Sequence, residues 1–363
     1  MTSSPAIRAL RASGQSLWLD NITRQILNDG TLQRYIDDLA VTGLTSNPTI
    51  FDLAIKSSSD YDATIRRLSA AGVAPEALFF DLALEDLTRA ADLFRPVFDA
   101  TGGRDGWVSL EVSPLLVNDA AGTIQAARQL HERAARPNLF IKIPGTLAGL
   151  VAIEEAIFAG VPVNVTLLFS LAQCVAANAA YVRGIERRLA QGLDAQVASV
   201  ASLFISRWDR AVVDTVPAAL HNRLGLAVAG RTLHAWQELH AAARWQKVAA
   251  AGAHPQRLLW ASTGTKDPGV ADTFYVDALA APDTVNTIPE KTLLAVADHG
   301  RVGSVMAADG IAAAAAMAQL AGAGVDETVL AAQLQLEGVA SFEASWHELM
   351  ARIAAKRAVV GVP

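Results

Sequence analysis

Residues 139–145 read Leu-Phe-Ile-Lys-Ile-Pro-Gly, and this stretch decides how the rest of the chain is interpreted. The run around Lys142 is apolar on both faces, as expected of a parallel strand buried on both sides. A lysine is costly to bury in such a strand. Burial favours the neutral form of an amine, and a neutral amine in a pocket can attack a ketone to form a Schiff base. The alternative is a lysine that reaches solvent at the strand end or pairs with a carboxylate.

Short β-rich segments alternate with amphipathic helical patterns on both sides of this run. Eight segments are predicted as strands: 16–21, 43–46, 106–112, 139–143, 162–169, 197–205, 257–263 and 283–288. Eight strands that alternate with helices predict an α/β fold, a closed (β/α)8 barrel of the TIM type. A doubly wound sheet is the main alternative. No G-x-G-x-x-G turn follows the first segment, which disfavours a dinucleotide-binding fold.

The C-terminal half carries more helix than a minimal barrel needs. A helical insertion is predicted at about 207–253, and a C-terminal helical tail at about 306–359. Between the strands, helices are predicted at 31–39, 75–98, 118–135 and 170–190. Asn118 is the predicted N-cap of the third of these helices. Because no linker rich in Pro, Gly or Ser interrupts the pattern, residues 1–363 are expected to form a single domain.

Composition excludes several classes of function. The 363 residues are 52% hydrophobic with a net charge of −6, and no basic stripe occurs, so nucleic acid is not the expected partner. No apolar run of ~18 residues predicts a membrane span, and the N-terminus does not resemble a signal peptide. The single Cys174 allows no internal disulfide, which fits a reducing cytoplasm. The sequence leaves open whether the chain forms a homo-oligomer.

Polar residues recur where the predicted strands end. In a (β/α)8 barrel these ends meet at one mouth, so the residues are expected to line a common pocket. Each one alone could instead be a helix cap, a turn residue or half of a structural ion pair. The residues are Asp20, Asn47, Glu111, Lys142, Asn164, Thr166, Ser202, Arg207, Ser262 and Lys266.

The residue types indicate carbonyl chemistry in this pocket. Lys142 is the predicted nucleophile, and Glu111 and Asp20 are the carboxylates that could shuttle protons. Thr166 could hold a water between Glu111 and the imine. No Asp, Glu and His cluster has metal-ligand spacing, so a metal-dependent aldolase is disfavoured and no metal is expected.

Other polar residues of the pocket suit a sugar phosphate. The amides of Asn47 and Asn164 can both donate to and accept from sugar hydroxyls. Arg207 and Ser262, with Lys266 as a further candidate, form a cationic, hydroxyl-bearing corner suited to phosphate.

Three ordered motifs resemble the transaldolase family. They are Gly-Leu-Thr-Ser-Asn-Pro-Thr-Ile-Phe at 43–51, Ile-Lys-Ile-Pro-Gly-Thr at 141–146 and Asn-Val-Thr-Leu-Leu-Phe-Ser at 164–170. The resemblance runs from about residue 16 to 300 and looks most like the longer bacterial members. It implies a (β/α)8 barrel without a cofactor. It also implies a transferase of the pentose phosphate pathway that moves a dihydroxyacetone unit between sugar phosphates through a lysine Schiff base.

The resemblance also implies a role for each residue. Lys142 would form the Schiff base, Glu111 and Thr166 would position the catalytic water, and Asp20 would transfer a proton during carbon–carbon cleavage. The residues that would bind substrate are Asn47, Asn164, Ser202, Arg207, Ser262 and Lys266. The family often places a second arginine just past the serine, but this chain reads Ser-Thr-Gly-Thr-Lys at 262–266.

Two alternatives to a transferase remain open. The related fructose 6-phosphate aldolases share the barrel and the lysine. In that group, however, the residue at the position of Glu111 looks like Gln, and a Tyr lies near the sixth strand. This chain has Glu111 and Phe204 there, which favours the transferase. The other alternative is a non-catalytic barrel that binds sugar phosphates, which a retained nucleophile and two carboxylates disfavour.

Overall fold

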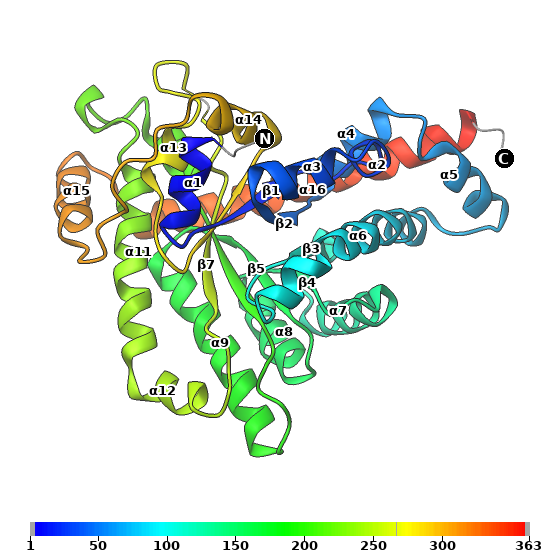
Figure 1. The fold of residues 1–363 in the computed structure, drawn as a ribbon, viewed down its shortest axis with the longest axis horizontal. Coiled ribbons are helices and arrows are strands. Elements are labelled where there is room, and N and C mark those ends of the chain that lie inside the picture. The colour runs from blue at the N-terminus through cyan, green and yellow to red at the C-terminus, as the bar shows by residue number, and fades with distance from the viewer. Residues whose placement is uncertain (1–3, 266, 360–363) are drawn as a thin grey trace.

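Eight parallel strands form a closed barrel in chain order (Figure 1). The structure is a computed structural model that describes residues 4–265 and 267–359. Strand β1 pairs with both β2 and β8, which closes the barrel. The (β/α)8 prediction is confirmed, and every predicted strand is present with ends that differ by at most two residues. The strands are β1 Ser16–Asp20, β2 Val41–Thr45, β3 Trp107–Glu111, β4 Leu139–Pro144, β5 Val163–Leu168, β6 Ser199–Phe204, β7 Arg257–Ala261 and β8 Val285–Ile288.

Helices surround the barrel and follow the strands in alternation. Those in the first half of the chain are α1 Pro5–Ala12, α2 Arg24–Asn28, α3 Thr31–Leu39, α4 Pro48–Ser57, α5 Asp62–Ala70, α6 Pro75–Ala100, α7 Ala120–Ala134 and α8 Leu147–Phe158. Those in the second half are α9 Leu171–Ala190, α10 Ser206–Val212, α11 Leu224–Ala241, α12 Ala243–Ala249, α13 Phe274–Ala278, α14 Glu290–His299, α15 Ile311–Gly322 and α16 Glu327–Val359. Short 3-10 turns occur at Pro114–Leu116 and Ala218–Leu220. The single-domain organisation stays a prediction.

Aromatic side chains fill the N-terminal part of the barrel interior. Trp107 stacks on Phe140 with ring centroids 4.0 Å apart, and Trp18 lies 6.2 Å from Phe140. A side chain at Gly43 would come within 2.7 Å of Trp18 and of the Trp107 carbonyl, so only glycine fits there. This apolar layer leaves the C-terminal ends of the strands as the place where polar side chains can gather.

Capping side chains set where the helices begin. The predicted N-cap Asn118 is wrong: α7 is capped by Asp119, whose Oδ1 accepts from the Gly122 amide at 2.9 Å. A cap must immediately precede the first turn to reach its amides, and Asp119 holds that place. Ser170 caps α9 in a capping box with Gln173.

The predicted C-terminal tail consists of two helices with different neighbours. Helix α15 packs against α11, where Gly230 allows close approach to Ala313. Helix α16 runs alongside α4 and contacts α5, α6 and β5, so it crosses the end of the barrel (Figure 1). This placement brings the last helix of the chain to the mouth where the first strands end.

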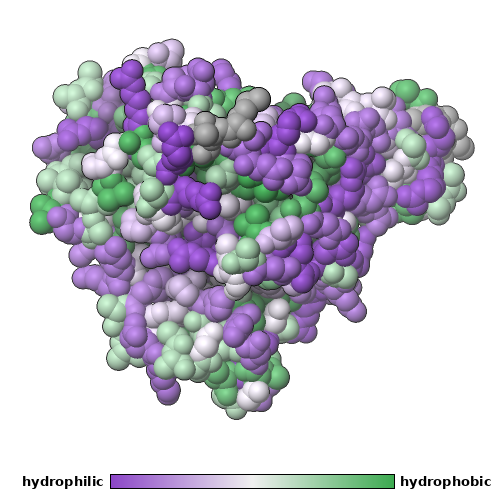
Figure 2. Space-filling view, viewed as in Figure 1, coloured by the Kyte–Doolittle hydropathy of each residue, from purple (hydrophilic) through white to green (hydrophobic). Residues whose placement is uncertain are grey.

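The surface mixes hydrophilic and apolar side chains on the face seen in Figure 2. Large exposed apolar residues are scattered over different elements, for example Leu147 on α8, Ile311 on α15 and Leu336 on α16. Among the residues that the structure describes, no helix is both long and apolar enough to span a membrane.

Candidate active site

A cavity of about 310 Å³ opens at the C-terminal end of the barrel. It is lined by side chains from the ends of several strands and from the helices that follow them, as expected of a barrel enzyme. The predicted site residues that line it are Asp20, Asn47, Lys142, Thr166, Ser202, Arg207 and Ser262. Lys266 lies outside the described residues.

Lys142 projects from β4 into this cavity and is almost fully buried. Its Nζ donates to the Ser46 carbonyl at 3.1 Å and to Glu111 Oε2 at 3.4 Å. Strand register explains the pairing, because Glu111 on β3 lies directly beside Lys142 on β4. An amine with one carboxylate partner and an open cavity on another side can lose its proton to that partner and attack a ligand.

Glu111 is a buried carboxyl group whose pKa lies near neutral pH. Burial raises the pKa of Glu111 to about 7, an effect that Lys142 opposes and Asp20 reinforces. Its Oε1 is buried with no hydrogen-bond partner among the described residues. A carboxyl group that titrates near neutral pH can take up a proton and return it, as general acid–base catalysis requires.

Asp20 is fixed at the end of β1 by a chain of hydroxyl groups. Thr45 on β2 donates to Asp20 Oδ1 at 2.7 Å, and Thr287 on β8 lies 2.7 Å from the Thr45 hydroxyl. Since Thr45 gives its only proton to Asp20, Thr287 is the donor to Thr45. Burial raises the pKa of Asp20, while Lys142 and the Thr45 hydrogen bond oppose that rise. Thr287 was not among the predicted residues.

Thr166 and Asn164 lie on the same face of β5 but in different environments. Thr166 lines the cavity, and its hydroxyl is buried without a partner among the described residues, so it is free to hold a water or a substrate hydroxyl. Asn164 is fully buried and does not line the cavity. Its Oδ1 accepts from Ser202 at 2.7 Å and its amide donates to Ser109 at 3.1 Å. Asn164 therefore positions Ser202 in this structure.

Arg207 and Ser262 lie together at another side of the cavity. Arg207 forms no ion pair with residues 4–265 or 267–359. Burial lowers the pKa of its guanidinium, an effect that the nearby Glu337 opposes. Its Cζ lies 5.5 Å from the centre of the Phe204 ring. Ser262 has a left-handed backbone, with φ of 56°, and its hydroxyl lies 2.9 Å from that of Ser206. A half-buried cation beside hydroxyl groups is suited to an anionic ligand.

Asn47 has a structural role as well as a place in the cavity. Its Oδ1 caps α4 by accepting from the Ile50 amide at 3.0 Å. The cap uses the carbonyl oxygen, so the amide group remains available to a ligand.

The C-terminal helix supplies two cavity residues that the sequence analysis missed. Ser341 and Phe342 on α16 line the cavity, and the Phe342 ring centre lies 5.8 Å from Lys142 Nζ. No motif marks them, and nothing in the local sequence of α16 indicates that it crosses the barrel.

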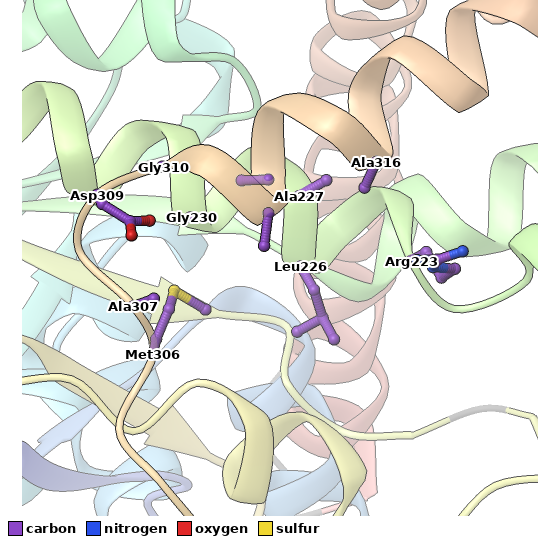
Figure 3. A pocket seen from close by; sticks show the side chains of 11 residues that line it. Arg223, Leu226, Ala227, Gly230, Met306, Ala307, Asp309, Gly310 and Ala316 are labelled. Carbon is purple, nitrogen blue, oxygen red and sulfur yellow. The ribbon is translucent and has the colours of Figure 1, made fainter.

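Other hollows lack a comparable set of groups. One of about 690 Å³ at the N-terminal end of the barrel has no lysine or cysteine among its described lining residues. A smaller one of about 200 Å³ lies between α11 and α15. Figure 3 shows that its two charged residues, Arg223 and Asp309, lie at opposite ends of a wall of apolar residues. Neither hollow has a lysine or a cysteine among its described lining residues. No group of three metal-binding side chains occurs among the described residues.

Comparisons with known proteins agree with this geometry. Residues 17–353 match the family model described as transaldolase/fructose-6-phosphate aldolase. The transaldolase of Saccharopolyspora erythraea is 43% identical over 361 residues, covering 96% of this chain and 97% of that protein. The transaldolase of Acidothermus cellulolyticus is 45% identical over 352 residues, covering 95% of each chain. The transaldolase of Neisseria gonorrhoeae is 41% identical over 343 residues, covering 94% of this chain and 97% of that protein.

Proposed function

The chain belongs to the transaldolase/fructose-6-phosphate aldolase family and is an enzyme with transaldolase function, and from this premise we propose how its residues perform the reaction. The reaction converts sedoheptulose 7-phosphate and glyceraldehyde 3-phosphate into erythrose 4-phosphate and fructose 6-phosphate. It moves a dihydroxyacetone unit. The observation that carries the proposal is the buried Lys142 amine 3.4 Å from a carboxyl group of raised pKa, in a cavity that also holds Arg207, which forms no ion pair with another described residue.

The first step is formation of the imine. Glu111 takes a proton from Lys142, and the neutral amine adds to the ketone of the donor to give a carbinolamine. Glu111 then returns the proton to the carbinolamine hydroxyl, which leaves as water. Thr166 is placed to hold that water. The group that removes the proton from the amine therefore also supplies the proton that the leaving hydroxyl needs.

The second step breaks a carbon–carbon bond. Asp20 accepts the proton of the substrate hydroxyl on the carbon that becomes the aldehyde. The bond electrons then move toward the iminium nitrogen, and the aldehyde phosphate leaves. A three-carbon enamine remains on Lys142. A second aldehyde phosphate reverses the step, takes the proton back from Asp20 and receives the three-carbon unit. Water then adds to the imine of the new ketose, which releases the product and the Lys142 amine.

The remaining polar residues are proposed to bind the substrate. Arg207 and Ser262 hold the phosphate, since Arg207 forms no other ion pair among the described residues and lies in the cavity wall. Asn47 and Ser202 contact sugar hydroxyls, and Asn164 acts by orienting Ser202. Lys266 stays a candidate from the sequence alone.

The compartment and pathway follow from the same proposal. One cysteine, a net charge of −6 and no basic stripe support an enzyme of the cytoplasm that acts on small anionic metabolites rather than on nucleic acid. Within the cytoplasm, the substrates are those of the pentose phosphate pathway.

The test of this function is its requirement for an acceptor. With fructose 6-phosphate alone, we expect about one equivalent of glyceraldehyde 3-phosphate in a burst, followed by slow release, because the three-carbon unit stays on Lys142. Adding erythrose 4-phosphate should allow continuous turnover. Release of free dihydroxyacetone at the rate of the exchange reaction would assign the chain to the aldolases instead. Binding without any turnover would identify a non-catalytic barrel.

Arg207→Ala tests the phosphate assignment. The loss of a charge-assisted contact should cost on the order of 2–4 kcal/mol in kcat/KM with phosphorylated substrates. Activity with fructose and unphosphorylated erythrose should fall much less. Arg210→Ala removes an exposed charge from the same helix and serves as the control. It should retain the wild-type preference for phosphorylated over unphosphorylated substrates. Equal losses of Arg207→Ala on both substrate types would show that Arg207 is structural.

A further inference from the structure

Helix α16 is anchored across the mouth of the barrel at two places. Near its N-terminal end, Gln335 Nε2 donates to the Leu167 carbonyl at 2.9 Å and to the Gly145 carbonyl at 3.2 Å. These carbonyls lie on β5 and just past β4. Farther along, Ser345 lies 2.8 Å from the Thr49 hydroxyl on α4, and Arg352 pairs with Asp52 at 3.2 Å. The segment between these anchors therefore lies directly over the cavity.

Close approach of α16 to the barrel depends on Gly338. A side chain there would come within 2.9 Å of Leu167 Cδ2. Helix packing at this distance brings Phe342, one turn beyond Gly338, down to Lys142. The Phe342 side chain is 7% exposed, and its ring centre is 5.8 Å from Lys142 Nζ.

Phe342 covers a side of the Lys142 nitrogen that the barrel leaves open. The Ser46 carbonyl and Glu111 occupy two directions around Nζ, and both are hydrogen-bond acceptors. Phe342 provides an apolar wall in a third direction. A second aromatic wall, Phe204, lies beside Arg207. Phe342 is thus an apolar side chain of the cavity wall, close to Lys142 and placed to keep bulk water away from the Schiff base.

We propose that Phe342 is a specificity-determining residue of the transfer reaction. It retains the three-carbon intermediate on Lys142 until an aldehyde arrives. The inference rests on the proposed function, because it concerns what happens to the enamine after the first aldehyde has left.

The competing reaction needs both a proton and a water molecule. The enamine carbon takes up a proton, which gives the iminium of dihydroxyacetone on Lys142. Water adds to that iminium, the carbinolamine collapses, and the products are dihydroxyacetone and the free Lys142 amine. Protonation of the enamine carbon is the step that the leak does not share with the exchange, and it becomes slower when bulk water cannot approach from the side of α16. In the exchange, addition to the incoming aldehyde replaces that protonation. The product imine is then hydrolysed as in the leak, so loss of Phe342 should change the exchange much less than the leak.

Phe342→Ala tests the proposal through a ratio of two rates. The leak is the release of dihydroxyacetone from fructose 6-phosphate alone, and the exchange is turnover with erythrose 4-phosphate present. We expect the leak-to-exchange ratio to rise about tenfold or more, which corresponds to about 1.4 kcal/mol in the difference between the two barriers. Leu336→Ala removes an exposed apolar side chain from the same helix, 71% exposed, and should leave the ratio unchanged.

Phe342→Leu is the conservative variant. It keeps an apolar side chain over Lys142, so its ratio should stay within about threefold of wild type, well below that of Phe342→Ala. If Phe342→Leu leaks as much as Phe342→Ala, an apolar side chain over Lys142 is not what retains the intermediate, and the proposal is wrong. Thermal unfolding and circular dichroism check that each variant is folded.

Borohydride trapping distinguishes a failure of the proposed function from a failure of the inference about Phe342. If wild type forms no trapped adduct with fructose 6-phosphate, the Schiff-base function itself is wrong. If adducts form in wild type and in both Phe342 variants but the leak-to-exchange ratio does not change, the function stands and the inference about Phe342 is wrong.

Discussion

Lys142→Arg should abolish the borohydride-trapped adduct with fructose 6-phosphate and reduce turnover on the order of 10⁴-fold or more, the scale seen when a covalent nucleophile is removed. Arginine keeps the positive charge beside Glu111, but a guanidinium does not act as a nucleophile at neutral pH. Because the ion pair can survive, loss of activity would report lost chemistry rather than lost charge. Mass spectrometry of trapped protein, followed by peptide mapping, locates the adduct.

A second lysine serves as the control for this substitution. Lys56 is exposed on α4, and Lys56→Arg should retain both the adduct and the turnover of wild type. The unfolding temperature of Lys142→Arg shows whether the larger side chain is tolerated in the cavity. A folded Lys142→Arg variant with a tenth of wild-type turnover would remove Lys142 from the mechanism.

The barrel and the base of its active site could be predicted because they depend on local patterns. Alternation of strands with helices identifies the fold, and the polar residues at strand ends converge because parallel strands all point to one mouth. Lys142 was informative for a physical reason: an amine inside an apolar strand is expensive, so it needs a partner such as Glu111.

The parts that escaped prediction depend on contacts between distant segments. The sequence predicts a helix at the position of α16 but gives no signal for what that helix covers, so the place of Phe342 over Lys142 is visible only in the fold. Thr287 was missed because its contact is with Thr45 across the closure of the barrel. Asn164 was expected to contact substrate, but whether an inward residue lines the cavity or lies beneath it depends on its depth along the strand. Periodicity gives only the face.

Glu111→Gln should lower turnover by on the order of 10²–10⁴-fold, the range expected for loss of a general acid–base group. The amide has nearly the same shape but cannot take the proton of Lys142 or return it to the carbinolamine hydroxyl. The step that should suffer is imine formation, so the trapped adduct should appear slowly although the donor still binds. Rapid-quench borohydride trapping measures that step directly.

The pH profile gives an independent measure of the same residue. Burial raises the pKa of wild-type Glu111 to about 7, so the carboxylate that is proposed to accept the Lys142 proton is present above that pH and is lost below it. Wild-type kcat/KM should therefore fall as the pH drops through about 7, and Glu111→Gln should lack that limb.

Asp20→Asn tests a different step of the reaction, because Asp20 is proposed to act after the imine has formed. It should form the trapped adduct at close to the wild-type rate but release no burst of glyceraldehyde 3-phosphate, since no group accepts the substrate proton during bond cleavage. Equal loss of trapping in the Glu111 and Asp20 variants would mean that the two carboxyl groups do not divide the reaction between them. Glu111 and Asp20 would then act together as one coupled acid–base pair beside Lys142.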